Sequence, residues 1–398
     1  MKGKKWQDFK KIRRIGVTKG SFESNGIFRW REGSWLRKIL ILVSLIFAAA
    51  VAGILMIQDQ QAEEDITAKT TRVGLILNGS HEDRNYNQTH FEALQSLQQD
   101  LNLKVIYREK VPDECYDVIE ELIQGEKCDI IVASSLAFGE DMKKAAAEYP
   151  NVYFLHAAGM GESANLSSFF GRMYQARYLA GIVAGMETTN GELGYVAAFP
   201  IPEVIRGINA FALGARSVRP DAKVYVRYCH SWTADEPAAD ACTKLLDAHP
   251  IDIITMHTDS LMPHKIAESR GVKSIGYNKD NHDLFTSTYL TAGEWNWQVY
   301  YRRQIWDCLR GKFHGRHTWV GMEDGIVKLS AFSNLVRKET KTAVEAANYR
   351  LVSREQDVFY GPIKDNQGNM RVEVGEAMSD QALLTKFDWY VEGVSVEQ

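Results

Sequence analysis

The sequence has few of the features that mark metalloproteins, nucleotide-binding loops or nucleophilic enzymes. Its 398 residues include only five cysteines, and none of these forms a CxxC pair or a metal-ligand spacing with histidine. The chain contains no GxGxxG motif and no Walker-type lysine loop, so a phosphate-bearing ligand is disfavoured. GxSxG, HExxH and calcium-loop patterns are also missing. We therefore expect no catalytic residue, no metal and no cofactor.

Long uncharged runs are also scarce. One of them separates a positively charged N-terminal segment from a negatively charged remainder. Residues 39–57 (ILILVSLIFAAAVAGILMI) are free of charge, close to the ~20 residues that a helix needs to cross a bilayer. Residues 1–38 carry twelve Lys and Arg against three acids, a net +9, whereas the rest of the chain sums to −13. Positively charged segments next to a membrane-spanning helix stay on the cytoplasmic side. We predict a cell-membrane protein with a basic cytoplasmic arm (1–38), a single-pass anchor (39–57), a polar linker (58–70) and an extracytoplasmic domain.

Other interpretations of this run stay open. Small residues at 48–50 could suit a signal peptidase, although the apolar run continues past them, and a buried soluble helix is a third possibility. An extracytoplasmic location permits a Cys229–Cys242 disulfide, which the odd cysteine count leaves open. Because the remainder is acidic and has no basic stripe, we expect no nucleic-acid binding.

After residue 70, short apolar runs alternate with amphipathic segments. The first series of strands is predicted at 72–77, 104–107, 129–133 and 152–155, and the first helices at 87–100, 113–124 and 140–149. The later helices are predicted at 172–186, 203–217, 238–248, 263–270, 297–310 and 338–347, and the later strands at 193–199, 223–228, 251–256, 274–277, 288–292 and 325–329. Such repeats predict parallel sheets with helices on both faces, and about 328 residues suit two α/β lobes better than one core.

Polar and aromatic side chains follow six of the predicted strands. Ligands of open α/β sheets bind at the carboxyl ends of the strands, so these clusters should converge on one cleft. Flat rings that can sandwich a planar ligand are Tyr86, Phe138, Phe199 and Trp232. Acceptors for ring N–H or hydroxyl groups are Asp83, Asn87, Glu140, Asp259 and Asp280. The pattern indicates a neutral or cationic heterocycle that is rich in hydrogen-bond donors.

At these residues the chain resembles the basic-membrane-protein family, the PnrA-like substrate-binding proteins of ABC transporters. Residues 83–88 (DRNYNQ) resemble the family element D-x-S-F-N-Q, with Tyr86 in the aromatic position. The other similar segments are 170–185, 194–216, 231–232, 257–260 and 388–393. The similarity extends over about residues 72 to 393.

The resemblance implies a type I periplasmic binding fold, α/β with two doubly wound Rossmann-like lobes joined by three crossovers. The lobes would comprise 71–165 plus 284–312 and 166–283 plus 313–393, with crossovers near 163–169, 282–288 and 312–319. They would close on a purine nucleoside or purine-like base and deliver it to an ABC permease and ATPase. The expected ligand contacts are Asp83, Tyr86, Asn87, Ser135, Phe138, Glu140, Phe199, Trp232, Asp259, Tyr277, Asp280 and Trp297.

Several positions depart from the family pattern. Ser135-Leu136-Ala137 replaces a Gly-Phe, Glu140 stands where the nearest subgroup has Asp, and Asn278 stands where Asp is common. The lipid-modified cysteine of many members is absent, and the apolar run replaces it. These departures predict an adjusted pocket and leave open which purine binds, and whether as base or nucleoside.

Two other functions remain as alternatives. A membrane-bound sensor would use the same cleft and pass its signal to another chain, because the basic arm is too short for a kinase or cyclase domain. A nucleoside-processing enzyme would use acidic cleft residues as acid and base.

Overall fold

The computed structural model describes residues 33–397, and within helix α1 (Gly33–Thr67) it describes the side chains of Trp35, residues 38–53 and residues 66–67. By its internal contacts the chain divides into two units, Met1–Glu63 and Glu64–Gln398. Within the described residues, the two large sheets and a small two-stranded sheet all belong to the second unit.

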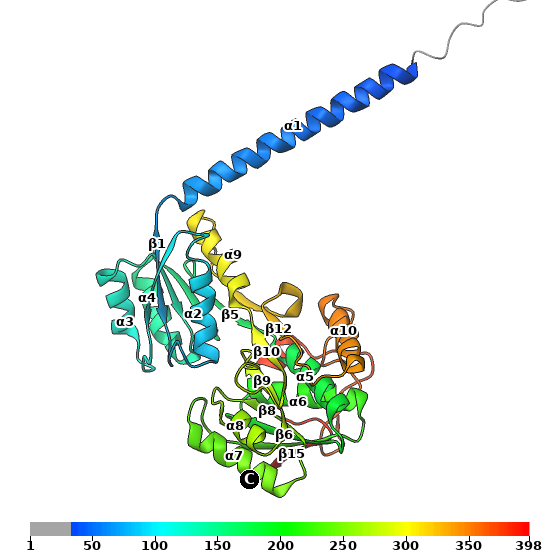
Figure 1. Cartoon of the computed structure of the whole chain (residues 1–398). Coiled ribbons are helices and arrows are strands. Elements are labelled where there is room, and N and C mark those ends of the chain that lie inside the picture. The colour runs from blue at the N-terminus through cyan, green and yellow to red at the C-terminus, as the bar shows by residue number, and fades with distance from the viewer. Residues whose placement is uncertain (1–32, 398) are drawn as a thin grey trace, which may run out of the picture. The chain divides into compact units, whose positions relative to one another are not determined.

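Helix α1 supplies most of what is described of the first unit (Figure 1). Its large hydrophobic side chains between Leu40 and Phe47 are 56% to 70% exposed. Among the residues that the structure describes, no helix combines the length and the apolarity that a membrane crossing requires. Residues 1–32 of the predicted basic arm and the side chains of residues 54–57 of the predicted anchor lie outside the described residues.

In the described chain the first sheet has six parallel strands in the order β11-β5-β4-β3-β1-β2. These are β1 (Thr71–Ile76), β2 (Leu103–Arg108), β3 (Ile130–Ala133), β4 (Tyr153–Ala157), β5 (Leu166–Gly171) and β11 (His317–Val320). The helices around it are α2 (Tyr86–Ser96), α3 (Tyr116–Glu120) with its π-helical continuation (Glu121–Gly125), α4 (Gly139–Glu148) and α9 (Trp297–Leu309). This sheet and these helices form the first lobe.

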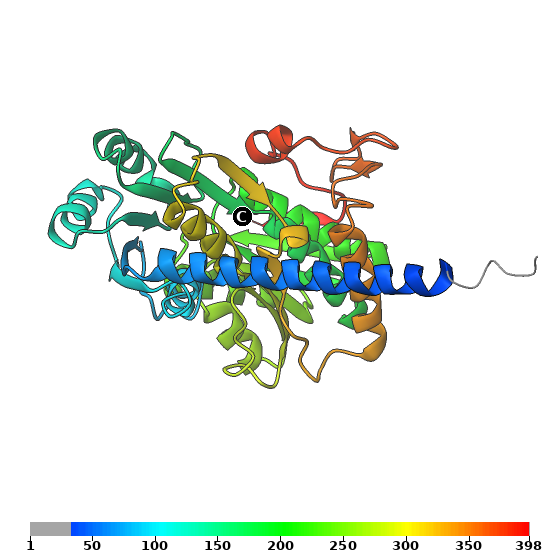
Figure 2. The ribbon, with the colours of Figure 1, turned by 90° about the horizontal axis from the view of Figure 1, so that it is seen from above.

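The helices cover both faces of this sheet, because side chains alternate along each strand. Val73 and Leu75 of β1 belong to the hydrophobic cluster of α2 and α9, whereas Ile76 belongs to the cluster of α3 and α4. Figure 2 shows α3 and α4, in cyan and green-cyan, across the first sheet from the yellow α9. The predicted doubly wound arrangement is confirmed for this lobe.

The second sheet has seven strands within the described residues, in the order β12-β10-β9-β8-β6-β7-β15. These are β6 (Glu192–Ala197), β7 (Lys223–Tyr228), β8 (Ile253–His257), β9 (Lys273–Asn278), β10 (Tyr289–Trp295), β12 (Val327–Leu329) and β15 (Val394–Glu397). Among these seven described strands only β12, which pairs with β10, is antiparallel. One face packs on α5 (Met173–Glu187) and α6 (Pro202–Val218), the other on α7 (Asp235–Ala248) and α8 (Met262–Ser269). These elements form the second lobe.

Helices α5 and α6 approach each other closely because glycines face the contact. A Cβ added to Gly181 would lie 2.0 Å from the carbonyl oxygen of Phe211, and one added to Gly214 would lie 1.9 Å from that of Tyr178. Real side chains cannot occupy such distances, so only glycine permits this packing. The close contact fixes α6, whose first turn lies at the carboxyl end of β6.

The chain passes between the two sheets three times, between β5 and α5, between β10 and α9, and between β11 and β12. The strand membership corrects the predicted lobe boundaries and crossover segments. Residues 166–171 and 317–320 form strands of the first sheet rather than of the second, and residues 289–295 form β10 of the second sheet rather than part of the first lobe.

The missed strands β5 and β11 contain polar residues that hide their pattern in the sequence. Ser167 and Ser168 of β5 are fully buried, yet both hydroxyls have partners. Ser167 Oγ accepts the backbone N–H of Arg316 (3.1 Å), and Ser168 Oγ bonds to Nδ1 of His317 (2.9 Å). Burial of these hydroxyls is tolerated because the neighbouring chain satisfies them.

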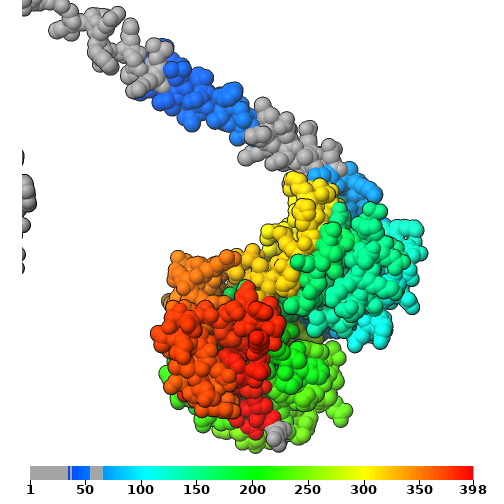
Figure 3. Space-filling model, turned by 180° about the vertical axis from the view of Figure 1, so that it is seen from behind, coloured from blue at the N-terminus to red at the C-terminus, as the bar shows by residue number. Residues whose placement is uncertain are grey.

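A C-terminal segment completes the second lobe. It comprises α10 (Lys338–Val352), β13 (Ile363–Lys364), β14 (Met370–Val372), α11 (Asp380–Thr385) and β15. Figure 3 shows it, orange to red, on the outside of that lobe. Asn209 of α6 fastens it, donating to the carbonyl of Trp389 (2.8 Å) and accepting the N–H of Val391 (3.0 Å). Residues 389–391 are therefore held as a loop against α6, and the strand β15 follows at Val394–Glu397.

All five cysteines lie in the described chain as buried free thiols, so Cys229 and Cys242 form no disulfide. Within the described residues no group of three His, Cys, Asp or Glu side chains is placed to hold a metal ion.

Candidate ligand-binding cleft

A cavity of about 400 Å³ lies where the loop after β1 meets the loops after β7 and β8. The first lobe contributes Asn78, Gly79, Ser80, Asp83, Asn87 and Lys110 to its walls, and the second contributes Thr233, Asp235, Asp259, Ser260, Leu261 and Lys265. The structure thus brings together three predicted ligand contacts, Asp83, Asn87 and Asp259, from the carboxyl ends of strands in both sheets.

Asp83 organises the loop that carries the first-lobe residues. Its Oδ1 accepts the backbone N–H groups of Asn85 (2.8 Å) and Gln88 (3.0 Å), and its Oδ2 accepts both the N–H (3.0 Å) and the side-chain amide (2.9 Å) of Asn87. The carboxylate therefore satisfies free N–H groups in the first turn of α2. Because both oxygens already accept hydrogen bonds from the protein, Asp83 positions the loop.

Tyr86 presents a partly buried ring from the first turn of α2. Its hydroxyl donates to the carbonyl of Ser134 at the end of β3 (2.9 Å), and its ring meets that of His90 edge to face at 4.7 Å. Burial raises the pKa of Tyr86, and the negative charges of Glu203 and Asp259 raise it further. Both of these carboxylates belong to the second lobe, so Tyr86 faces the second lobe across the cleft.

Asp259 is the carboxylate at the centre of the second-lobe wall. Its backbone carbonyl accepts the side-chain amide of Asn85 (2.7 Å), which joins the two lobes, and its Oδ1 accepts the amide of Asn278 (2.7 Å). Asn278 is fixed in turn by the indole N–H of Trp295 (2.8 Å). Burial raises the pKa of Asp259, and the charges of Asp83 and Glu203 raise it further. Within the described residues Oδ2 has no hydrogen-bond partner, so it can accept one from a ligand.

Two aromatic residues lie next to Asp259 but do not line the cavity, and one of them, Trp232, accepts the backbone N–H of Asp259 with its carbonyl (2.7 Å). Phe199 and Trp232 are both partly exposed, with ring centroids 5.7 Å apart. Trp232 also lies 6.1 Å from the ring of His257, which contacts Tyr277 at 4.4 Å. Tyr277 is 3% exposed and carries the guanidinium of Arg177 over its ring at 4.1 Å. Phe199 and Trp232 therefore offer ring faces, while Tyr277 packs against His257 behind Trp232.

Sequence reasoning missed Glu203, in the first turn of α6. Its Oε1 lies 3.8 Å from Nε2 of His257, and its charge raises the pKa of Tyr86, Asp259 and Tyr277. Burial lowers the pKa of His257 to about 4, so this imidazole is neutral beside the carboxylate. The available signal was its place one residue after the Phe-Pro-Ile-Pro cluster that follows β6.

Three of the predicted ligand contacts do not line this cavity. Phe138 is fully buried in the core between α3 and α4, and Glu140 is 90% exposed and pairs with Lys143 (2.8 Å). Trp297 is 1% exposed because its ring is stacked between those of Trp295 (4.3 Å) and His90 (4.7 Å). These three residues are packing or surface residues.

The side chains of Ser135 and Asp280 form hydrogen bonds with neighbouring residues of their own loops. Ser135 Oγ accepts the N–H of Ala137 (3.3 Å) and so caps a 3-10 turn. Asp280 accepts the N–H of His282 (3.0 Å) and bonds to its ring Nδ1 (2.9 Å). Both shape strand ends, and neither is a residue of the cavity wall.

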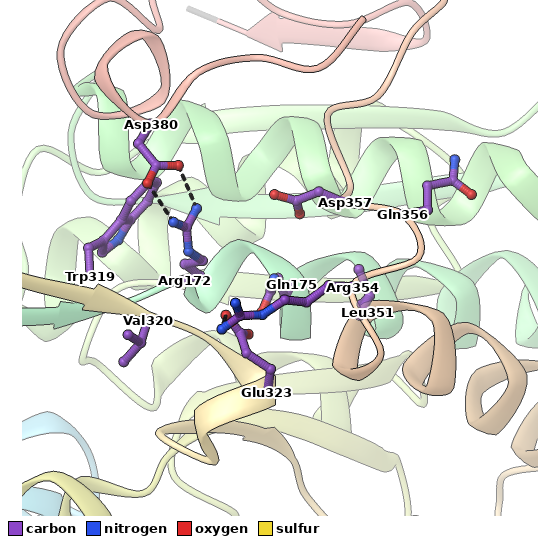
Figure 4. A pocket seen from close by; sticks show the side chains of 10 residues that line it. All are labelled: Arg172, Gln175, Trp319, Val320, Glu323, Leu351, Arg354, Gln356, Asp357 and Asp380. Atoms are coloured by element: carbon purple, nitrogen blue, oxygen red, sulfur yellow. Dashed lines mark hydrogen bonds and ion pairs between the residues drawn. The ribbon is translucent and has the colours of Figure 1, made fainter. Parts of the chain in front are cut away.

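A second cavity, of about 300 Å³, lies beside the crossovers rather than at the strand ends. Arg172, which follows β5, pairs there with Asp380 of α11 (Nη2–Oδ2 2.6 Å), as Figure 4 shows. Its guanidinium also lies 4.1 Å from the ring centroid of Trp319. The C-terminal segment is thus tied to the first crossover by a charge pair.

Comparisons with known proteins identify the family and the fold. The family model described as ABC transporter substrate-binding protein PnrA-like matches residues 70–357. A purine-binding protein of Brucella abortus is 34% identical over 351 residues, 87% of this chain and 97% of that protein. A protein of Haloferax volcanii, named for ABC-transporter glucose binding, is 34% identical over 317 residues, 79% of this chain and 78% of that protein. A solved solute-binding protein from Conexibacter woesei shares the fold with a TM-score of 0.62 and 19% identity, covering 72% of this chain and 98% of that one.

Proposed function

This chain belongs to the PnrA-like family of ABC transporter substrate-binding proteins, and from that membership and the cleft we propose that it captures a purine base or nucleoside for an ABC importer. Its family consists of solute-binding proteins rather than enzymes. Binding and release between two lobes is all the chemistry that this role requires.

The pairing of Asp259 with the Phe199–Trp232 wall carries the proposal. A purine presents a flat face and edge N–H donors, and stacking on an aromatic ring contributes ~0.5–1.5 kcal/mol beyond area burial. Asp259 offers an unpaired oxygen beside those rings. Glu203 adds a second acceptor nearby. Its carboxylate lies next to His257, and the ring of His257 lies next to that of Trp232. The named role of the Brucella relative supports the same ligand class.

Calorimetric titration of the chain with adenine, hypoxanthine, guanine, their nucleosides and glucose tests the proposal. We expect saturable binding of at least one purine and none of glucose. Glucose binding without purine binding would refute the assignment and favour the role for which the Haloferax relative is named.

We also propose that residues 39–57 anchor the protein in the cell membrane with the binding lobes outside. The charge-free run, the net +9 before it and the exposed hydrophobic side chains of Leu40–Phe47 support this orientation. Cell fractionation combined with protease treatment of intact cells tests it. Membrane-bound, protease-accessible lobes are expected, whereas a chain beginning after residue 50 would indicate a cleaved signal peptide.

A further inference from the structure

A cavity of about 390 Å³ lies between α9, β11 and the third crossover. Tyr300, Arg303 and Gln304 of α9 form one wall, and residues 316–320 form the opposite one. Trp319, Val320 and Arg354 line both this cavity and the one in Figure 4. No predicted purine contact lines it, so it is separate from the cleft.

Three buried polar atoms on its walls have no hydrogen-bond partner within the described protein. They are Oη of Tyr300, Nε2 of His317 and Nε1 of Trp319. Tyr300 is only 4% exposed. Buried polar atoms without partners cost free energy, which a hydrogen-bonding group in the cavity would recover.

Positive charge dominates the rim of this cavity. Arg303, Arg316 and Arg354 line it, while Asp324, its acidic neighbour, is 3.7 Å from the guanidinium of Arg354. Within the described residues, no carboxylate lies within 4.0 Å of the guanidinium of Arg303 or Arg316. Burial raises the pKa of Tyr300, and the charges of Arg316 and Arg303 oppose this rise. Both arginines line the same cavity as Tyr300.

We propose that this cavity binds a small organic anion at the third crossover. Its anionic group, a carboxylate or a phosphate, accepts hydrogen bonds from Arg303, Arg316 and Tyr300. Guanidinium groups bind both anions through charge-assisted hydrogen bonds, which are stronger than neutral ones. The apolar part of the ligand contacts Val299, Val320 and Ile326, which complete the lining.

Titration of the full chain with benzoate, phenyl phosphate and neutral benzamide tests this site. We expect saturable binding of at least one anion and none of benzamide, with the two anions distinguishing a carboxylate ligand from a phosphate ligand. The double variant Arg303→Gln/Arg316→Gln should weaken anion binding at least tenfold. Both side chains are exposed, so the variant is expected to fold normally.

Arg310→Gln is the matched control, because this exposed arginine follows the same helix and is not part of the cavity lining. It should bind the anion within twofold of the parent chain. Absence of anion binding, or unchanged affinity in the double variant, would overturn the proposal and leave the buried polar atoms to solvent. Purine titrations of the same samples report the cleft separately, so the two proposals fail independently.

Discussion

At the scale of single residues, the cleft separates groups that hold the loops from groups left to meet a ligand. Asp83 and Asn87 satisfy each other and the start of α2. Asp259, Trp232 and Phe199 keep an oxygen or a ring face available. Mutations of the two kinds should therefore differ, with loss of stability for the first and loss of affinity for the second.

Trp232→Ala should lower purine affinity at least tenfold, about 1.4 kcal/mol, because it removes the stacking face beside Phe199. Calorimetry with the best purine measures this. Tyr349→Ala is the control, since Tyr349 is 66% exposed on α10. Equal affinity of the Trp232 variant and the parent chain would reject Trp232 as a ligand contact.

Asp259→Asn should also lower purine affinity at least tenfold, about 1.4 kcal/mol, because an ionised acceptor is lost. The pKa of Asp259 is raised by burial, so the folded protein holds this proton more tightly than the unfolded chain does. Stability of the unliganded protein should therefore increase as pH falls through the raised pKa, while purine affinity falls.

The same variant should be more stable than the parent at neutral pH, because no buried charge has to be held there. Thermal unfolding without ligand, followed across pH, measures both effects. Glu140→Gln, at a 90% exposed carboxylate, should change neither stability nor affinity. A parent whose purine affinity does not vary with pH would show that Asp259 is not an ionised acceptor.

At the scale of elements, the α5–α6 contact sets where the second-lobe wall lies. Gly181→Ala should destabilise the protein by roughly 1–3 kcal/mol, because its Cβ would collide with the backbone of α6. Denaturant unfolding measures the loss. Gly125→Ala is the control, since the nearest atom to its added Cβ is 3.9 Å away. Equal stability of the two variants would argue that α6 shifts without cost.

At the scale of the whole molecule, residues 64–398 hold both large sheets and the cleft. We expect this unit, produced alone, to be soluble and to bind the same purine with the affinity of the full chain. Its thermal unfolding should not change on addition of a reducing agent, because all five thiols are free. Aggregation of this unit under mild conditions would contradict its independence.

Much of the fold could be predicted from the sequence, and less of the site. The sequence predicts β1 to β4 and α5 to α8 from their hydrophobic periodicity, because each element buries one continuous apolar face or stripe. It does not predict the strands β5 and β11, since their buried Ser167 and Ser168 look like loop residues until partners from a distant segment satisfy them. Contacts across 149 residues leave no local signal.

The sequence by itself determined the two-lobed α/β class, the family and the strand ends around which the cleft forms, because these depend on periodicity and local motifs. Only the tertiary structure decided which strand-end side chains face the cleft. Phe138 is buried in the core and Trp297 stacks on Trp295. Glu203 lies next to His257, close to the aromatic rings of the second lobe. The direction of a side chain depends on what packs against it, and that neighbour is usually far away in sequence.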